Sequence, residues 1–230
     1  MGPTFADGKN GGAESGFLRP LVAGSCAQTA PIRSHRRNTA RPALASRSLL
    51  VLLLASLLPP APATASEEAW SALARGGTVA LMRHARAPGT GDPAGFRLED
   101  CTTQRNLSDD GRAQARRIGE AFRQRRIAVA SVLSSRWCRA LDTARLAFGD
   151  AVRPFPPLDS FFAGRGSSEE QTQGARREIA AWQGREGVLV MVTHQVNITA
   201  LTGIFPQEGE AVVLAPASDG SPRVLGTVRP

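Results

Sequence analysis

The chain has 230 residues, enough for one globular domain of ordinary size, and a formal net charge of +8 at pH 7. Residues 1–65 hold seven of the 28 basic and two of the 20 acidic residues, so the remainder carries 21 against 18, a net charge of +3. Neither part shows a basic stripe interleaved with aromatic residues, which excludes the nucleic-acid-binding class.

Residues 1–65 have the pattern of a leader. A basic flank precedes an apolar run at residues 49–58, and residues 63–65 (Ala-Thr-Ala) form a small-x-small site. This order is typical of a secretory signal peptide, here cut between Ala65 and Ser66. The run is too short to span a bilayer as a mature helix. We therefore expect a periplasmic or secreted domain, residues 66–230, without stable membrane insertion; an uncleaved membrane anchor is the alternative.

The domain begins with a short amphipathic helix at residues 67–75 and a buried strand at residues 79–82. Arg83 and His84 follow directly, and then comes a loop of about twenty residues. Loops this long in a compact domain are usually functional or disordered. We expect this loop to form the rim of a pocket, with Gln104 and Arg105 contacting a substrate; disorder is the alternative for residues 88–95.

Helices and strands alternate through the rest of the chain. Ser108 has the position of a helix N-cap, and Arg139 follows a strand end as His84 does. A late strand ends at His194. The expected helices are 108–126, 138–148, 167–182 and a short one from 197, and the expected strands are 127–134, 152–158, 187–193, 211–214 and 223–228. This order predicts an α/β fold of three layers, α/β/α, with a mainly parallel sheet covered by helices on both faces and a closing antiparallel pair.

Two arginines and two histidines are thus expected at one edge of the sheet: Arg83, His84, Arg139 and His194. Each alone could be structural, but the carboxyl ends of parallel strands meet where open α/β sheets bind ligands. Four cationic or proton-bearing groups repel one another unless an anion lies among them. A phosphoryl group is such an anion, and arginine offers it forked donors.

Zinc would be the rival use of two histidines. A zinc site requires a third ligand from Cys, Asp or Glu, and neighbouring arginines raise the local positive charge. We therefore expect no metal and no other cofactor.

Four segments, in this order, resemble the histidine phosphatase (phosphoglycerate-mutase-like) superfamily, and the resemblance spans about residues 77–203. The first is Arg83-His84-Ala85, with alanine in place of the family's glycine. The others are residues 107–115 (Leu-Ser-Asp-Asp-Gly-Arg-Ala-Gln-Ala), residues 134–144 (Ser-Ser-Arg-Trp-Cys-Arg-Ala-Leu-Asp-Thr-Ala) and Thr193-His194.

The resemblance implies chemistry through a phosphohistidine. His84 would attack phosphorus while its other ring nitrogen donates to a fixed acceptor such as a backbone carbonyl. Arg83 and Arg139 would neutralise the phosphoryl oxygens, and His194 would donate to another of them.

The family pattern is incomplete at the proton donor. Acid-phosphatase relatives carry His-Asp at the last motif, whereas Gln195, which we expect only to contact substrate, follows His194 here. Mutase-like relatives use a glutamate earlier in the chain. Asp159 is our candidate acid, because Phe161 and Phe162 could desolvate it and raise its pKa. The alternative is that no acid exists and the substrates have good leaving groups.

Residues 158–162 and 193–198 are similar to a small exported bacterial branch related to phosphatases of phosphorylated heptose in the lipopolysaccharide core. The sequence therefore predicts an exported, metal-independent phosphomonoesterase that acts on a small phosphorylated substrate such as a phosphosugar. The alternative is a catalytically idle protein that binds phosphate or a phosphosugar on the same fold. Removal of the leader leaves Cys101 and Cys138, either as a disulfide that pins the rim loop or as two free thiols.

Overall fold

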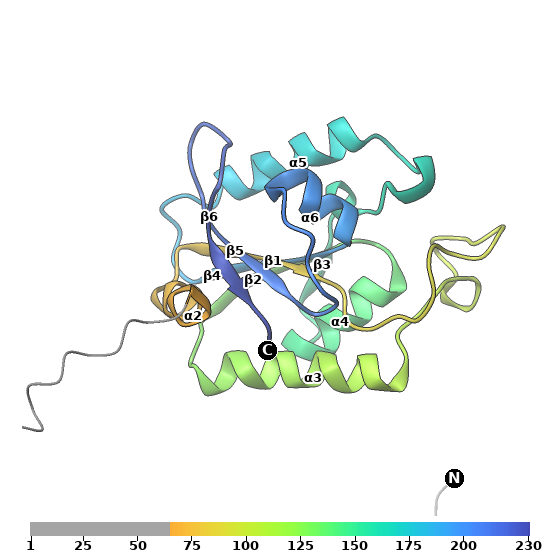
Figure 1. The fold of residues 1–230 in the computed structure, drawn as a ribbon, viewed down its shortest axis with the longest axis horizontal. Coiled ribbons are helices and arrows are strands. Elements are labelled where there is room, and N and C mark those ends of the chain that lie inside the picture. The colour runs from red at the N-terminus through yellow and green to blue at the C-terminus, as the bar shows by residue number, and fades with distance from the viewer. Residues whose placement is uncertain (1–64) are drawn as a thin grey trace, which may run out of the picture. The chain divides into compact units, whose positions relative to one another are not determined.

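The computed structural model describes residues 65–230, which form a six-stranded sheet with helices on both faces (Figure 1). The predicted leader therefore lies, except for Ala65, outside the described residues. No helix within the described part of the chain is both long and apolar enough to span a bilayer.

The strand order is β3-β2-β4-β1-β5-β6. The first four strands in this order are parallel, and β5 and β6 pair antiparallel at one edge. The bounds are β1 Thr78–Arg83, β2 Val129–Ser134, β3 Val152–Pro154, β4 Val188–Thr193, β5 Ala211–Ala215 and β6 Arg223–Val228. The predicted α/β fold with a mainly parallel sheet is confirmed.

Two apolar layers pack against the sheet. One lies between the sheet and α2, α3 and α4, and the other between the sheet and α5 and α6, so the helices occupy opposite sides in Figure 1. The bounds are α2 Ala65–Arg75, α3 Asp109–Gln124, α4 Cys138–Phe148, α5 Ser168–Ala180 and α6 Gln195–Thr202. The central strand β4 is buried along its whole length, as its unbroken apolar sequence requires.

Two glycines of α3 allow close approach of backbones. A Cβ at Gly111 would lie 2.0 Å from the carbonyl oxygen of Arg86, and one at Gly119 would lie 2.0 Å from that of Ala147. Gly111 thus lets the first turn of α3 touch the chain just after β1. The Ser108 side chain caps this turn by accepting from the Gly111 N–H at 3.1 Å, as predicted.

Several predicted boundaries differ from the structure. The edge strand expected at 152–158 ends at Pro154, because proline lacks the N–H that a ladder needs, and a 3₁₀ helix, η3 Pro156–Leu158, follows. Two more 3₁₀ helices, η2 Cys101–Thr103 and η4 Phe162–Gly164, lie in segments where no element was expected.

The register of the central strands places their last residues side by side. Arg83 of β1 is opposite Thr193 of β4, and Ser134 of β2 is opposite Val192. The pairing continues past the strands, since the His84 N–H donates to the Thr193 carbonyl at 3.0 Å. Residues that follow three different strands are therefore gathered at one edge of the sheet.

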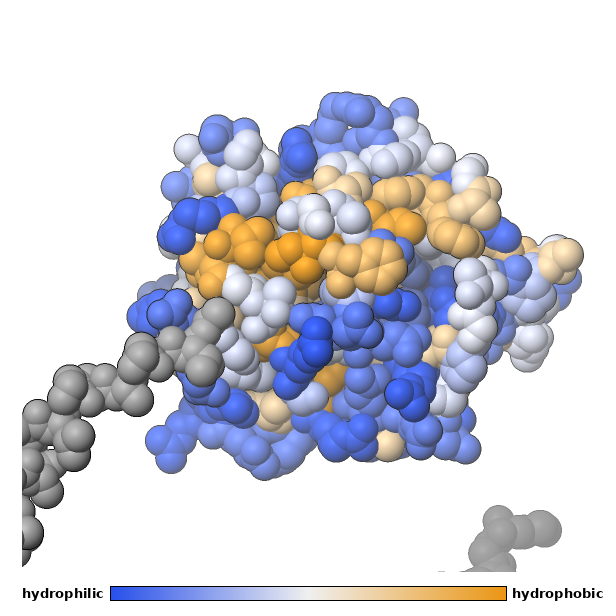
Figure 2. Space-filling view, in the orientation of Figure 1, coloured by the Kyte–Doolittle hydropathy of each residue, from blue (hydrophilic) through white to orange (hydrophobic). Residues whose placement is uncertain are grey.

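The face shown in Figure 2 has an apolar band across its middle, over β5, β6 and the chain that follows α6. Phe205, in that connecting chain, is the most exposed large apolar side chain of the described residues, at 65%. It lies at the mouth of the pocket described next.

Candidate active site

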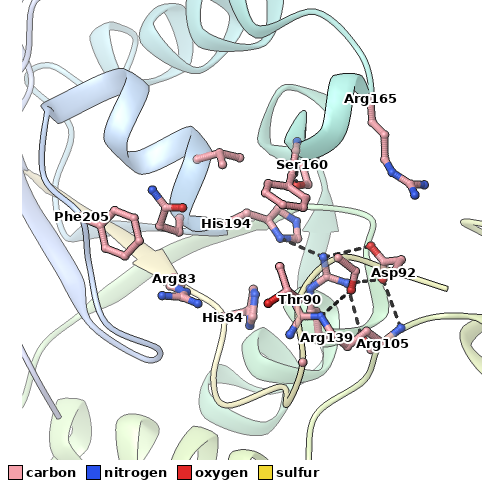
Figure 3. A pocket seen from close by; sticks show the side chains of 15 residues that line it. Arg83, His84, Thr90, Asp92, Arg105, Arg139, Ser160, Arg165, His194 and Phe205 are labelled. Carbon is pink, nitrogen blue, oxygen red and sulfur yellow. Dashed lines mark hydrogen bonds and ion pairs between the residues drawn. The ribbon is translucent and has the colours of Figure 1, made fainter.

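A pocket of about 230 Å³ lies at the carboxyl ends of β1 and β4. Its floor is made by Arg83, His84, Arg139 and His194, so the structure brings the four predicted residues together (Figure 3). The two imidazole rings are 5.4 Å apart between centroids. The walls come from the rim loop with Thr90, Asp92 and Arg105, from the segment with Ser160, Phe162 and Arg165, and from Gln195, Val196 and Phe205.

The His84 ring is buried and has a fixed orientation. Its Nδ1 lies 2.7 Å from the Ala85 carbonyl oxygen, which can only accept a hydrogen bond, so Nδ1 carries the proton and Nε2 keeps its lone pair. Ala85 is itself held, because its N–H donates to the Thr143 hydroxyl at 2.9 Å. Burial lowers the pKa of His84 well below its usual value, and the charge of Arg139 lowers it further. The ring is therefore neutral at pH 7, with an unprotonated nitrogen available as a nucleophile.

His194 is the second neutral imidazole of the site. Burial is the main cause of its lowered pKa, and the charge of Arg139 adds to it. Its Nε2 lies 2.8 Å from the Ser135 hydroxyl, and its Nδ1 lies 3.5 Å from a guanidinium nitrogen of Arg139. The Ser135 hydroxyl donates to a carboxylate oxygen of Asp159 at 3.3 Å, so it accepts from the Nε2–H of His194, and Nδ1 carries the lone pair.

Arg139 is anchored by a carboxylate that the sequence did not lead us to expect. Its Nη1 donates to Asp92 at 2.7 Å, and both side chains are almost fully buried. Asp92 also accepts from the Trp137 indole at 3.0 Å and from the Arg105 N–H at 3.2 Å. Burial alone would raise the pKa of Asp92, but the hydrogen bond and charge of Arg139 outweigh it, and the pKa is lowered.

The anchoring leaves part of Arg139 available to a ligand. Its Nη2 makes only long contacts, 3.4 Å to Asp92 and 3.5 Å to His194, and its buried Nε has no hydrogen-bond partner in the described residues. Burial lowers the pKa of Arg139 to about 10, and the charges of Arg105 and Arg165 act in the same direction. Such a desolvated, under-bonded guanidinium is a favourable site for an oxyanion.

Arg83 and Arg105 are also held by the chain. Arg83 donates to the Pro206 carbonyl at 3.0 Å and lies 3.9 Å from Glu208. Arg105 donates to the carbonyls of Ala87 and, at 2.8 Å, Gly91. The contacts of Arg105 fix the rim loop, those of Arg83 hold its side chain against the chain that follows α6, and both guanidinium groups line the pocket.

The rim loop is tied to α4 by a disulfide. Cys101, in η2, is bonded to Cys138, the first residue of α4, with their Cα atoms 5.7 Å apart. The sequence left a bridge and two free thiols as alternatives, and the structure has the bridge. The bridge places a covalent link one residue before Arg139.

Two further expectations about the site require correction. Gln104 does not line the pocket: its amide donates to the Leu98 carbonyl at 2.8 Å and accepts from the Cys138 N–H at 3.0 Å, so it supports the loop. Asp159 lies in a neighbouring hollow and accepts from Arg136 at the backbone N–H (2.8 Å) and at Nε (2.7 Å). This arrangement gives it no direct access to the pocket. Gln195 does line the pocket, as expected, with its amide nitrogen 2.9 Å from the Thr199 hydroxyl.

Several further residues of the site were not predicted from the sequence pattern. Ser135 and Thr143 lie inside the 134–144 segment, whose pattern could have indicated a role for them. Asp92 and Arg165 lie in irregular loops, where no periodicity or motif marks them. Within the described residues, no group of three His, Cys, Asp or Glu side chains is placed to hold a metal ion.

Residues 79–165 match the family model of the histidine phosphatase superfamily, branch 1. The matched stretch runs from β1 past α4 and includes Arg83, His84 and Arg139, whereas His194 lies beyond it. A comparison with curated proteins gave no match.

Several solved structures are similar to this one at low sequence identity. The protein histidine phosphatase SixA complexed with tungstate is 14% identical, with a TM-score of 0.48 over 65% of this chain and 95% of that one. Phosphoserine phosphatase from Entamoeba histolytica, in complex with 3-phosphoglyceric acid, is 14% identical with a TM-score of 0.46 over 65% and 95%. Mycobacterial glucosyl-3-phosphoglycerate phosphatase is 19% identical with a TM-score of 0.45 over 60% and 89%. None of these likenesses assigns a substrate to this chain.

Proposed function

We propose that the protein hydrolyses a phosphomonoester through a phosphohistidine on His84, and the match of residues 79–165 to the histidine phosphatase superfamily model supports this proposal. One observation carries the proposal. The Nδ1–H of His84 is committed to the Ala85 carbonyl, so the Nε2 lone pair is free in a pocket that is also lined by Arg83, Arg105 and Arg139. A neutral nucleophile surrounded by cations is suited to a phosphoryl group.

The reaction has two displacements at phosphorus. In the first, His84 Nε2 forms a bond to phosphorus and the bond from phosphorus to the ester oxygen breaks, so the leaving group departs with the electron pair. The phosphorylated ring is then cationic, and its Nδ1–H remains bonded to the Ala85 carbonyl. In the second, water attacks phosphorus, the P–N bond breaks, the water proton is released, and His84 is regenerated with inorganic phosphate as product.

The arginines stabilise the charge on the phosphoryl oxygens, and His194 helps to position one of them. Arg139 offers Nη2, whose contacts with Asp92 and His194 are long, 3.4 Å and 3.5 Å. The Ser135 hydroxyl donates to Asp159 and therefore accepts from the Nε2–H of His194. Nδ1 of His194 then keeps its lone pair and faces the Arg139 guanidinium, so in this arrangement His194 orients Arg139 and does not donate to the substrate.

The carboxylates near the site favour substrates with good leaving groups. Asp92 is ion-paired with Arg139, and Asp159 is ion-paired with Arg136 at 2.6 Å and lines a neighbouring hollow, so neither is placed as an acid at the leaving group. Aryl phosphates, acyl phosphates and phosphohistidine need little or no protonation of the departing atom. Phosphosugars, including phosphorylated heptose of the lipopolysaccharide core, are the second substrate class, and a screen of small phosphorylated compounds separates the two.

The proposal includes export and independence of metal ions. The apolar run at 49–58 and the Ala-Thr-Ala site at 63–65 support export, and the Cys101–Cys138 disulfide suits an oxidising compartment. The arginines supply the positive charge that a metal would otherwise give. Mass spectrometry of the periplasmic protein should find an amino terminus close to Ser66; an intact leader in the membrane fraction would establish an anchor instead.

The decisive experiment uses His84→Ala with nitrophenyl phosphate. We expect wild-type turnover to persist in EDTA and the variant to be inactive, whereas Arg153→Ala, a surface change on β3, should retain activity. Rapid quench with labelled substrate should trap an acid-labile, base-stable phosphoprotein in wild type but not in His84→Ala. Near-normal turnover in His84→Ala would end the assignment.

One observation favours the alternative of an idle phosphate-binding protein: among the described residues, Asp92 is the only carboxylate that lines the pocket, and it is ion-paired with Arg139. A binder should show calorimetric binding of inorganic phosphate and no turnover of nitrophenyl phosphate. Turnover that His84→Ala abolishes excludes it.

A further inference from the structure

Among the described residues, four arginines line the pocket, and three of them are held by hydrogen bonds. Arg83 is bonded to the Pro206 carbonyl, Arg105 to carbonyls of the rim loop, and Arg139 to Asp92. Arg165 makes no hydrogen bond and no ion pair with any residue in the described range 65–230. A half-buried guanidinium that lines a pocket without a partner is positioned for a ligand.

Arg165 is nevertheless held in place. Its guanidinium carbon lies 4.1 Å from the centre of the Phe96 ring, a cation–π contact. Phe96 packs on Trp137 with 5.7 Å between ring centres, and Trp137 packs on His194 at 5.5 Å. This stack of rings connects Arg165 to the site, and it covers one face of the guanidinium while leaving its N–H edge free.

The position of Arg165 separates it from the phosphoryl subsite. In Figure 3, Arg165 and Arg83 lie on opposite sides of the view, with His84 and His194 between them. A second hollow of about 400 Å³ adjoins the pocket here, and the two share Ser160 and Arg165 as lining residues. A substrate whose phosphate is at His84 can therefore extend past Arg165 into this second space.

We propose that Arg165 binds a second oxyanion, a carboxylate or another phosphate, on the leaving group of the substrate. The preferred substrates are then phosphomonoesters that carry a further negative charge, and Arg165 is the residue that selects them. This inference deepens the proposed function and rests on it for the position of the ester phosphate.

With a neutral leaving group, the N–H groups of Arg165 would have only water as a hydrogen-bond partner. An oxyanion there gains charge-assisted hydrogen bonds from a guanidinium whose aromatic support reduces its mobility. Such bonds correspond to a preference of about tenfold or more over a neutral group of the same shape.

The test compares three aryl phosphates that differ in one substituent: 4-carboxyphenyl, 4-phosphonophenyl and 4-carbamoylphenyl phosphate. The carboxamide is the neutral isostere of the carboxylate, and the phosphonate distinguishes a phosphate-like second group. We expect the full chain to show a kcat/KM ratio of charged over neutral substrate of about tenfold or more. The charged substrate with the larger ratio identifies the oxyanion.

Variants assign the preference to Arg165. In Arg165→Gln the ratio should fall to about one, in Arg165→Lys it should be intermediate, and in Arg165→Glu it should invert. The matched control is Arg153→Gln, an exposed arginine on β3 whose loss should leave the wild-type ratio. A wild-type ratio near one, or a ratio unchanged in Arg165→Gln, overturns the inference.

The design separates this inference from the proposed function. If none of the three compounds is turned over, the proposed function fails, and calorimetric binding of the same compounds measures the ratio instead. If all are turned over at equal kcat/KM, the proposed function stands and the Arg165 inference fails.

Discussion

The charge state and hydrogen bonds of single residues decide how the site can work. Asp159 illustrates this, because its carboxylate is buried but both oxygens accept hydrogen bonds from Arg136. Its connection to the pocket runs through Ser135, whose hydroxyl lies between Asp159 and His194. Asp159 is therefore placed to support His194 and not to protonate a leaving group directly.

Substituting Asp159 by Asn tests these two roles. A supporting residue should lower activity on an alkyl phosphate and on nitrophenyl phosphate by the same factor, because both reactions use the same phosphoryl subsite. Loss of the ion pair with Arg136 should also lower the free energy of unfolding, by about 1–3 kcal/mol given the buried carboxylate. Selective loss on the alkyl phosphate would instead restore Asp159 as the acid.

The sequence predicts the residues that follow strands, because an apolar run and the residue after it are adjacent in the chain. His84 and His194 could be placed at one edge on that basis alone. Asp92 and Arg165 could not, since each reaches the pocket from an irregular loop whose path depends on distant contacts. Asp92 is fixed by the Trp137 indole, 45 residues away in sequence.

At the scale of elements, the rim loop is the least regular part of the site and depends most on cross-links. It holds one 3₁₀ helix, η2, and reaches α4 through the Cys101–Cys138 disulfide and through Gln104. Periodicity predicts the long helices well, because α3 and α4 bury one face each. It cannot predict η2, since tertiary contacts fix that turn.

Replacing both cysteines by serine should loosen the loop. The bridge joins two residues with a sequence separation of 37. For a loop of that length, removal of the bridge should lower the unfolding free energy by about 4 kcal/mol. The loop carries Asp92, which orients Arg139, so we also expect KM to rise. Denaturant titration and steady-state kinetics measure the two effects.

Reduced wild-type protein is the control for this pair of substitutions. Dithiothreitol should lower the stability of the wild type toward that of the double variant and leave the variant unchanged. Stability and KM that are the same with and without the bridge would show that Gln104 and Asp92 hold the loop by themselves.

At the scale of the whole molecule, the site buries two imidazoles, those of His84 and His194, among arginines. The sheet causes this burial. Because β1 and β4 pair side by side, His84 and His194, which follow them, lie together beneath the loops and helices at the carboxyl ends of the strands. Neutral histidines satisfy this burial, and protonated ones would not. The stability of the entire domain is thereby linked to pH.

The sign of that link follows from the lowered pKa values of His84 and His194. An unfolded histidine has a pKa near 6.5, so below about pH 6.5 the unfolded chain binds protons that the folded chain does not. The unfolding free energy should be fully present above pH 6.5 and fall as the pH drops, by up to about 1.4 kcal/mol per pH unit for each buried histidine. The pKa of Asp92 is also lowered, and its contribution to stability is lost only as the pH falls toward and below the ordinary aspartate pKa near 3.8.

Urea titrations between pH 5.0 and 6.5 therefore isolate the histidines. His84→Gln should reduce the slope of unfolding free energy against pH by about the contribution of one histidine. An equal slope in wild type and variant would mean that folding does not lower the pKa of His84, which would contradict a buried, permanently neutral nucleophile.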